Sequence, residues 1–183
     1  MSILLTTDRL ILCPLGAEHA ETVQDYLLRN KTFFKPWSPI PSADFYELEN
    51  IEKRMHQEKW NASQKKQLRF YAFSITDKAK QYILADIHYS NLIFGAFRSC
   101  FLGYKTDERA CGKGIMTEAL RASNAYLFEH WGLHRIEANI MPSNKASLRV
   151  VEKLGFESEG LARNYLNING HWEDHLRFAL RNE

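Results

Sequence analysis

Two glycines lie one residue apart, at Gly112 and Gly114, directly before a segment whose pattern indicates a helix ending at Trp131. A glycine turn at the start of a helix leaves backbone N–H groups uncovered, and the helix N-terminus adds partial positive charge. Arg109 precedes the turn and Lys113 lies within it. These residues are suited to binding an anion, and a diphosphate in particular.

Two common phosphate motifs do not fit this turn. A Walker-type loop has a longer gap between its glycines and a Lys followed by Ser or Thr, whereas Gly114 follows Lys113 here. A dinucleotide fingerprint has three glycines and an acidic residue about 20 positions later. Thr117 adds a hydroxyl in the first turn of the helix. A tight turn without any ligand is the alternative interpretation.

The elements that would position this turn alternate between strands and helices. We expect strands at residues 9–14, 69–76, 81–89, 97–106, 135–141, 159–168 and 172–180, and helices at 18–29, 44–64, 114–131 and from an N-cap at Ser143 to Leu154. The prolines within residues 33–41 predict a structured loop there. Asn169-Gly170 predicts a hairpin between the last two strands. The chain therefore reads as one mixed α/β domain over residues 1–183.

Composition and charge exclude several functional classes. A formal net charge of +2 without a concentrated basic face gives no nucleic-acid footprint. No apolar run reaches the roughly 18 residues of a membrane span, and the N-terminus lacks the features of a signal peptide. Cys13, Cys100 and Cys111 have no paired spacing, which fits a reducing cytoplasm and gives no metal-ligand pattern. We expect a cytoplasmic monomer or homodimer without metal, membrane or direct nucleic-acid partner.

Cys111 lies inside the glycine turn, where a helix N-terminus would lower the pKa of its thiol. Free cysteines more often behave as small apolar residues, and we interpret Cys111 as a spacer on that ground. A reactive thiol is the alternative.

The glycine turn and a second segment together resemble the Gcn5-related N-acetyltransferases. The coenzyme motif of that family, Gln/Arg-x-x-Gly-x-Gly/Ala, is matched by Arg109, Gly112 and Gly114. A second family block, with a strand, an Asn and a helix ending in Gly-Phe, is matched by residues 136–147 and by Gly155-Phe156. Further segments resemble the ribosomal-protein alanine N-acetyltransferases of this family: 34–37, 90–91, 102–104, 134–136, 162–170, Trp172 and 174–175. The resemblance covers nearly the whole chain.

The resemblance implies a mixed, mostly antiparallel sheet that splays between its fourth and fifth strands, with helices on both faces. It also implies acetyl-coenzyme A as the acetyl donor, with its pantetheine arm between the splayed strands and its diphosphate on the glycine turn. The residues implied in binding it are Tyr104, Lys105, Thr106, Arg109, Gly112, Lys113, Gly114, Thr117, Asn139, Asn144 and Ser147.

Three residues are candidates for the chemistry of acetyl transfer. The backbone N–H near Tyr104 would polarise the thioester carbonyl. The Ser147 hydroxyl would donate a proton to the departing sulfur, which needs little help because a thiol has a pKa of about 8.5; a structural serine is the alternative. Glu137 is the nearest carboxylate for a base, and a salt bridge with Arg135 is the alternative role for it.

A strong general base is missing from the expected site. Related N-terminal acetylases of another branch carry a Glu five residues before the conserved Asn and a Tyr seven after it, and those positions are Asn139 and Val151 here. Histidines 88, 134, 171 and 175 are candidates for a water relay. At pH 7 an α-amine of pKa about 7.8 is roughly one-seventh neutral, whereas a lysine of pKa about 10.4 is neutral once in roughly 2,500. The site therefore favours an α-amine.

The expected reaction is acetylation of a protein or peptide N-terminus, with a ribosomal protein as one candidate acceptor. The loop at residues 33–41, including Trp37, and the acidic helix after Asp44 lie where the family places its acceptor-side elements. A core-anchoring tryptophan and a solvated helix face are the alternative interpretation, and for the charges we favour the solvated face. Two other functions stay open: acetylation of a small-molecule amine or antibiotic, and a non-catalytic module that binds coenzyme A.

Overall fold

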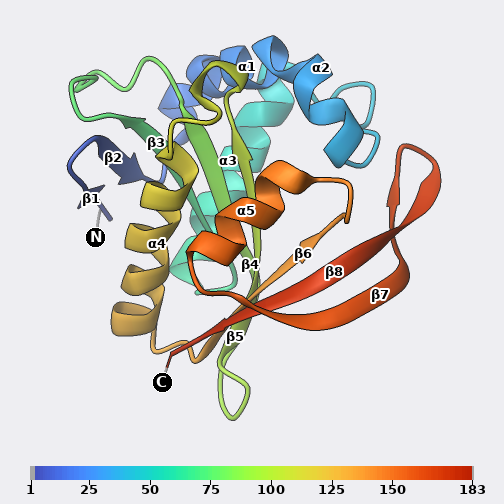
Figure 1. The fold of residues 1–183 in the computed structure, drawn as a ribbon. Helices are drawn as coiled ribbons and strands as arrows, with labels where there is room; N and C mark the ends of the chain where they lie inside the picture. Colours follow the sequence, from blue (N-terminus) through green and yellow to red (C-terminus); the bar gives the residue numbers. More distant parts are fainter. Residues whose placement is uncertain (1–2, 183) are drawn as a thin grey trace.

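The computed structural model describes residues 3–182, and an eight-stranded sheet runs through it (Figure 1). The strands are β1 (Leu5–Thr6), β2 (Leu10–Cys13), β3 (Leu68–Ser74), β4 (Ala85–Ile93), β5 (Ser99–Thr106), β6 (Arg135–Ile140), β7 (Glu157–Ile168) and β8 (His171–Arg181). Their order in the sheet is β1-β2-β3-β4-β5-β6-β8-β7. The β5–β6 pair is parallel and the other pairs are antiparallel. The expected mixed, mostly antiparallel sheet is confirmed.

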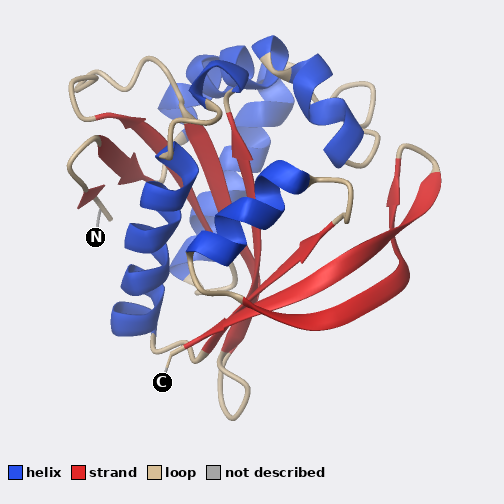
Figure 2. Ribbon diagram, in the orientation of Figure 1, coloured by secondary structure: helices blue, strands red, loops and turns tan. Residues whose placement is uncertain are grey.

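Helices cover both faces of the sheet (Figure 2). One face carries α4 (Ile115–Trp131) and α5 (Lys145–Lys153), and the other carries α1 (Ala20–Arg29) and α3 (Leu48–Ser63). Successive side chains of a strand point to opposite faces, so Phe70 of β3 packs in the core under α4 while Tyr71 packs under α1 and α3. The sheet thus separates two apolar cores, as expected for a three-layer α/β domain.

Besides shifted bounds, such as β4 beginning at Ala85 and α3 at Leu48, the structure differs from the sequence-based expectations in three places. Residues 33–41 were expected as a loop, but α2 (Lys31–Phe34) and the 3₁₀ helix η2 (Lys35–Trp37) begin this segment. Pro36 is compatible with η2 because it lies in the first turn, where a backbone N–H has no intrahelical partner. Helix α5 is capped by Asn144 and not by Ser143. A short strand, β1, precedes the first expected one.

The hairpin expected at Asn169-Gly170 is confirmed. Asn169 has φ 51° and Gly170 has φ 84°, and the turn joins β7 to β8. Two successive residues at positive φ match the turn that fits the twist of a tight hairpin. The Asn169 amide donates to the carbonyl of Lys35 at 2.6 Å, so the hairpin tip is tied to η2 (Figure 1).

The parallel pair β5–β6 separates part-way along its length. Its register runs from Ser99 opposite Arg135 to Leu102 opposite Ala138, and no pair follows although β5 continues to Thr106. Because β1 adds one strand, β5 and β6 are the expected fourth and fifth strands, and the expected position of the splay is confirmed. The segment Gly103–Thr106 therefore has backbone groups on its β6 side that no strand occupies.

A buried carboxylate fixes the end of β5. Asp107 accepts hydrogen bonds from Arg29 Nε at 2.8 Å, from Asn30 Nδ2 at 2.9 Å and from the Arg109 backbone N–H at 3.0 Å. Burial acts to raise the pKa of Asp107, but these hydrogen bonds outweigh it and the pKa is lowered. The carboxylate therefore connects the splayed end of β5 to the C-terminus of α1.

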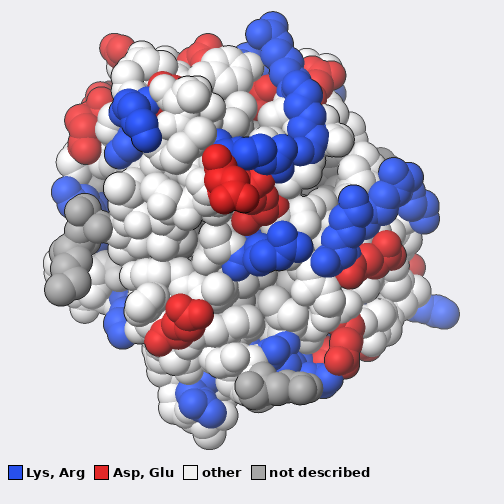
Figure 3. Space-filling view, turned by 60° about the vertical axis from the view of Figure 1, so that its left-hand side comes forward, with Lys and Arg blue, Asp and Glu red and all other residues white. Residues whose placement is uncertain are grey.

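Three global features of residues 3–182 bear on function. In this part of the chain, no helix is long and apolar enough to cross a membrane. Nor does it contain a group of three or more His, Cys, Asp or Glu residues placed to hold a metal ion. Basic and acidic side chains both occur on the face of the molecule shown in Figure 3.

Candidate active site

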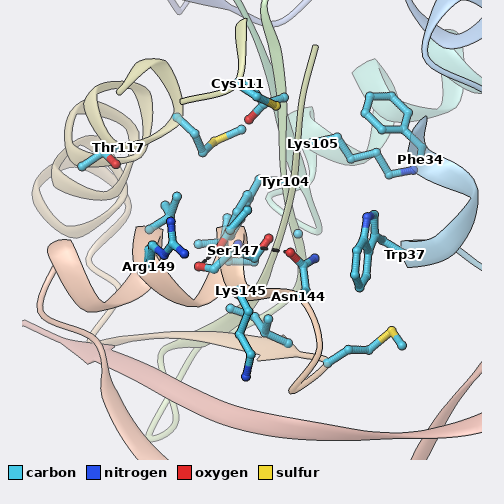
Figure 4. Close-up of a pocket in the computed structure, with 18 of the residues that line it drawn as sticks. Phe34, Trp37, Tyr104, Lys105, Cys111, Thr117, Asn144, Lys145, Ser147 and Arg149 are labelled. Atoms are coloured by element: carbon cyan, nitrogen blue, oxygen red, sulfur yellow. Dashed lines mark hydrogen bonds between the residues drawn. The ribbon is translucent and has the colours of Figure 1, made fainter. Parts of the chain in front are cut away.

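A cleft of about 740 Å³ lies where β5 and β6 separate. The glycine turn and α5 line one part of it, and Phe34 and Trp37 line another (Figure 4). The residues expected from the sequence that line this cleft are Tyr104, Lys105, Thr106, Gly112, Gly114, Thr117, Asn139, Asn144 and Ser147. They come from β5, the glycine turn, α4, β6 and α5 and its cap, and the splay brings them to one place.

The glycine turn has the backbone geometry of an open anion cradle. Gly112 has φ 74° and Gly114 has φ 75°, values that side-chain-bearing residues rarely adopt. No atom lies within 4 Å of the position that a Cβ of Gly112 would occupy, so the backbone is open there. Gly114 is the N-cap of α4, whose first N–H groups have no intrahelical partner. The turn and helix can therefore hold an anion such as a diphosphate.

The turn is held in place by Arg9, which directly precedes β2. Arg9 Nη1 donates to the carbonyl of Lys113 at 3.0 Å, and Arg9 Nη2 pairs with the Glu118 carboxylate at 2.5 Å. Burial acts to raise the pKa of Glu118, but hydrogen bonds from Thr7 and Arg9 outweigh it and the pKa is lowered. A carboxylate in the first turn of α4 is also favoured by the helix dipole.

Ser147 is held on α5 by two hydrogen bonds of its backbone. Its N–H donates to Asn144 Oδ1 at 3.1 Å, and its carbonyl accepts from the Tyr104 hydroxyl at 3.0 Å (Figure 4). Burial raises the pKa of Tyr104, so this phenol stays protonated and its proton is engaged. The Ser147 hydroxyl itself makes no hydrogen bond to any residue from 3 to 182 and faces the cleft.

Two unpartnered polar atoms line the far part of the cleft. Ser38 Oγ and Asn139 Oδ1 are buried and have no hydrogen-bond partner within residues 3–182. Buried polar atoms in folded proteins nearly always have a partner, so these two atoms are available to hydrogen-bond a molecule in the cleft. His175 of β8 is also buried at this end, with its Nδ1 3.0 Å from the carbonyl of Glu173.

Three of the expected site residues do not line the cleft. Arg109 and Lys113 are exposed and lie outside its wall. Glu137 is buried elsewhere, with its carboxylate 2.8 Å from Arg135 Nε and 3.2 Å from Arg177 Nη2. A carboxylate engaged by two guanidinium groups and remote from the cleft is not positioned to act as a base. The salt bridge left open by the sequence is the role observed for Glu137.

Cys111 lines the cleft with its Sγ 3.4 Å from the carbonyl of Asp107. Partial burial and the nearby carboxylates of Asp107 and Glu108 raise the pKa of its thiol. These effects oppose the lowering expected from the helix N-terminus, and they favour the unreactive thiol.

Sequence reasoning missed a row of basic residues on α5. Lys145, Arg149 and Lys153 are exposed, line the cleft and follow one another at intervals of four residues. Residues four apart lie on the same face of a helix, so this spacing was the signal that could have revealed the row. Figure 4 shows Lys145 and Arg149 beside Ser147. Three cations along the wall add to the positive end of α4 and suit a ligand with several phosphate groups.

A second cavity of about 230 Å³ lies on the α1 and α3 side of the sheet. It shares Gly103, Tyr104 and Lys105 with the cleft. Its other lining residues are Val23, Tyr26, Leu27, Phe45, Arg54, Arg69, Tyr71, Asp86 and His88. Burial, with the positive charge of Arg69, lowers the pKa of His88 to about 4, so its imidazole is neutral at pH 7.

The model of the acetyltransferase (GNAT) domain family matches residues 9–157, and the chain belongs to that family. It is 38% identical over 176 residues to the [ribosomal protein uS5]-alanine N-acetyltransferase of Escherichia coli (strain K12), a match that covers 96% of this chain and 89% of that protein. A "Probable N-acetyltransferase YjcK" of Bacillus subtilis (strain 168) is also 38% identical, over 92% of each chain.

A solved structure supports the same grouping. The ribosomal-protein-S5-alanine acetyltransferase from Vibrio fischeri matches with a TM-score of 0.93 and 31% identity, covering 99% of this chain and 97% of that one. The protein is therefore an N-acetyltransferase of the GNAT type, and it is similar to enzymes named for the modification of ribosomal proteins.

Proposed function

We propose that this protein transfers an acetyl group from acetyl-coenzyme A to the α-amine at the N-terminus of a protein, with a ribosomal protein as the candidate acceptor. The observation that carries the proposal is the cleft at the β5–β6 splay, which has an anion cradle at one part and the aromatic residues Phe34 and Trp37 at another. The similarity to the Escherichia coli relative, which is named as an alanine N-acetyltransferase of uS5, supports the acceptor class.

The residues of the cleft fit the acetyl donor. The N–H groups after Gly112 and Gly114 would take the diphosphate, with the α5 cations beside it. The backbone of Gly103–Thr106 on the β6 side, together with Asn144, would hydrogen-bond the amide-containing pantetheine arm. Asn139 Oδ1 would gain the partner that it lacks. Acetyl-coenzyme A would supply an acetyl group activated as a thioester.

The backbone and side chains of this protein would then stabilise the developing charge and transfer protons. A backbone N–H of the unpaired part of β5, near Tyr104, would stabilise negative charge on the acetyl oxygen. As the new C–N bond forms and the C–S bond breaks, the free hydroxyl of Ser147 would donate its proton to the sulfur and would regain one, through water, from the amine nitrogen that becomes acidic on attack. With Glu137 engaged in a salt bridge, no carboxylate lines the cleft within residues 3–182. This favours an α-amine, which is partly neutral at pH 7 without a base.

The test is acetylation of a matched peptide panel. One peptide has a free N-terminal Ala and no Lys, a second has its N-terminus blocked and one internal Lys, and small amines such as spermidine complete the panel. We expect acetylation of the free N-terminal Ala alone, mapped by intact mass and fragmentation. Reaction only at lysine or at the small amines would overturn the acceptor proposal. Coenzyme binding by calorimetry without turnover of any amine would identify a non-catalytic module.

A further inference from the structure

The second cavity and the cleft share a stretch of β5, Gly103 to Lys105, in which Gly103 has no side chain. Gly103 lies in β5 with ordinary extended backbone, and nothing lies within 4 Å of the position that its Cβ would occupy. Neither backbone strain nor packing therefore requires glycine here. Gly103 lies opposite His88 in the sheet, and Lys105 lies on the same face two residues later. The absent side chain leaves open space where the two cavities share a wall.

Charged groups on this face are unequally paired. Arg69 is engaged by two carboxylates, Glu58 at 2.9 Å and Asp86 at 2.5 Å. Arg54 and Lys105 have no carboxylate within 4.0 Å among residues 3–182, and both are partly buried at the cavity wall. Three cations thus face two carboxylates, and the cavity has an excess of positive charge. Burial and the charges of Arg69 and Arg54 lower the pKa of Lys105, although Asp86 opposes them.

The position of Lys105 connects this charge to the cleft. Its ammonium lies 5.3 Å from the centre of the Phe34 ring, and Figure 4 shows it directed toward Phe34 and Trp37. The hydroxyl of Tyr26 donates to the Lys105 carbonyl at 3.0 Å, which fixes the backbone of β5 at this point. The ammonium therefore stands where the two cavities meet, on the face of the sheet opposite α5.

We propose that the second cavity receives the first residues of the acceptor chain, that they enter over Gly103, and that Arg54 and Lys105 select an acceptor with a carboxylate next to its terminal residue. The inference rests on the proposed function and adds the acceptor class to it: a small first residue followed by an acidic one. At about 230 Å³ the cavity is smaller than the roughly 300–1,000 Å³ of pockets that enclose a drug-sized ligand. The excess positive charge disfavours an acceptor with a cation at the same place.

The first experiment fills the passage. In Gly103→Ala and Gly103→Val, the added side chains point into open space and the backbone needs no change. We expect the KM for an Ala-Glu peptide to rise about threefold in the Ala variant and at least tenfold in the Val variant, with the Kd for coenzyme A unchanged by calorimetry. If the Val variant fails to fold, the KM of the Ala variant still tests the inference. A KM unaffected by either variant would overturn the inference.

The second experiment measures selection by charge. Three peptides differ only at their second residue, Ala-Glu, Ala-Gln and Ala-Lys. At low salt we expect kcat/KM for Ala-Glu to exceed that for Ala-Lys by at least about tenfold, with Ala-Gln between them. In an Arg54→Gln, Lys105→Gln double variant the ratio should fall to within about twofold. Lys53→Gln is the matched control, since Lys53 is an exposed neighbour on α3 that pairs with Glu49.

The outcomes separate this inference from the proposed function. Acetylation of all three peptides at equal rates, or a ratio that the double variant leaves intact, would overturn the charge selection and leave α-amine acetylation standing. Failure of every free N-terminal peptide to react would overturn both. A higher kcat/KM for Ala-Lys than for Ala-Glu would contradict the excess positive charge assigned to the cavity.

Discussion

Among the single residues of the site, Ser147 is the one best placed to donate a proton. Its backbone is fixed on both sides, by Asn144 and by the Tyr104 hydroxyl, while its own hydroxyl is free in the cleft. A departing thiolate of pKa about 8.5 needs only a weak proton donor. The fixed backbone therefore supplies the position, and the free hydroxyl supplies the proton.

Replacing Ser147 with Ala tests this role. We expect kcat to fall by roughly 10- to 100-fold, the lower part of the range for general acid catalysis, because the leaving group is already a good one. The Kd for coenzyme A should stay within about twofold. Ser158→Ala, which removes an exposed hydroxyl of β7 outside the cleft, is the control and should retain full activity. An unchanged kcat in Ser147→Ala would remove Ser147 from the mechanism.

Among the elements, β5 and its continuation carry the site, and their end depends on one buried carboxylate. Arg29 bonds to Asp107, whose side chain is 1% exposed, and also to Asp25, whose side chain is 62% exposed. Breaking a buried pair leaves an uncompensated charge, whereas an exposed pair contributes little. The Arg29 guanidinium therefore forms two ion pairs that contribute very differently to the stability of the fold.

We predict that Asp107→Ala lowers the free energy of unfolding by about 3 to 5 kcal/mol, because Arg29 and Asn30 lose their buried partner. Asp25→Ala, the matched control on the same Arg29, should lower it by about 1 kcal/mol or less. Urea unfolding at pH 7 measures both. Equal effects of the two substitutions would show that Asp107 does not fix β5 to α1.

The elements also show which features could be predicted from the sequence. The glycine turn and the helix after Asn144 are each made of consecutive residues, so their sequence signals are local and both were found. The ion pair of Glu137 with Arg177 was not found, because β8 rather than β7 pairs with β6 and this order is not visible along the chain. The second cavity was missed for the same reason: its cations come from α3, β3 and β5.

At the scale of the whole molecule, the cleft brings together elements that are far apart in the chain. The glycine turn of α4, the open end of β5 and the basic row of α5 would contact one donor molecule. A ligand that binds the folded state and not the unfolded chain stabilises the fold by mass action. Donor binding should therefore be visible as stabilisation of the whole domain, while acceptor-side changes should leave it intact.

The final prediction uses this linkage. Coenzyme A at about 100 times its Kd should add about 2.7 kcal/mol of stability and raise the Tm by roughly 5 to 11 °C for a domain of this size. Gly103→Ala should keep the whole shift, because only the backbone of Gly103 would contact the donor and the added methyl group would lie on the face of the sheet opposite α5. A variant with Lys145, Arg149 and Lys153 all changed to Gln should unfold near the wild-type Tm without ligand, since these side chains are exposed, but should show a smaller shift at the same coenzyme concentration. Thermal scans by fluorescence or calorimetry distinguish these results. An equal shift in the triple variant would mean that the α5 cations do not face the bound phosphates.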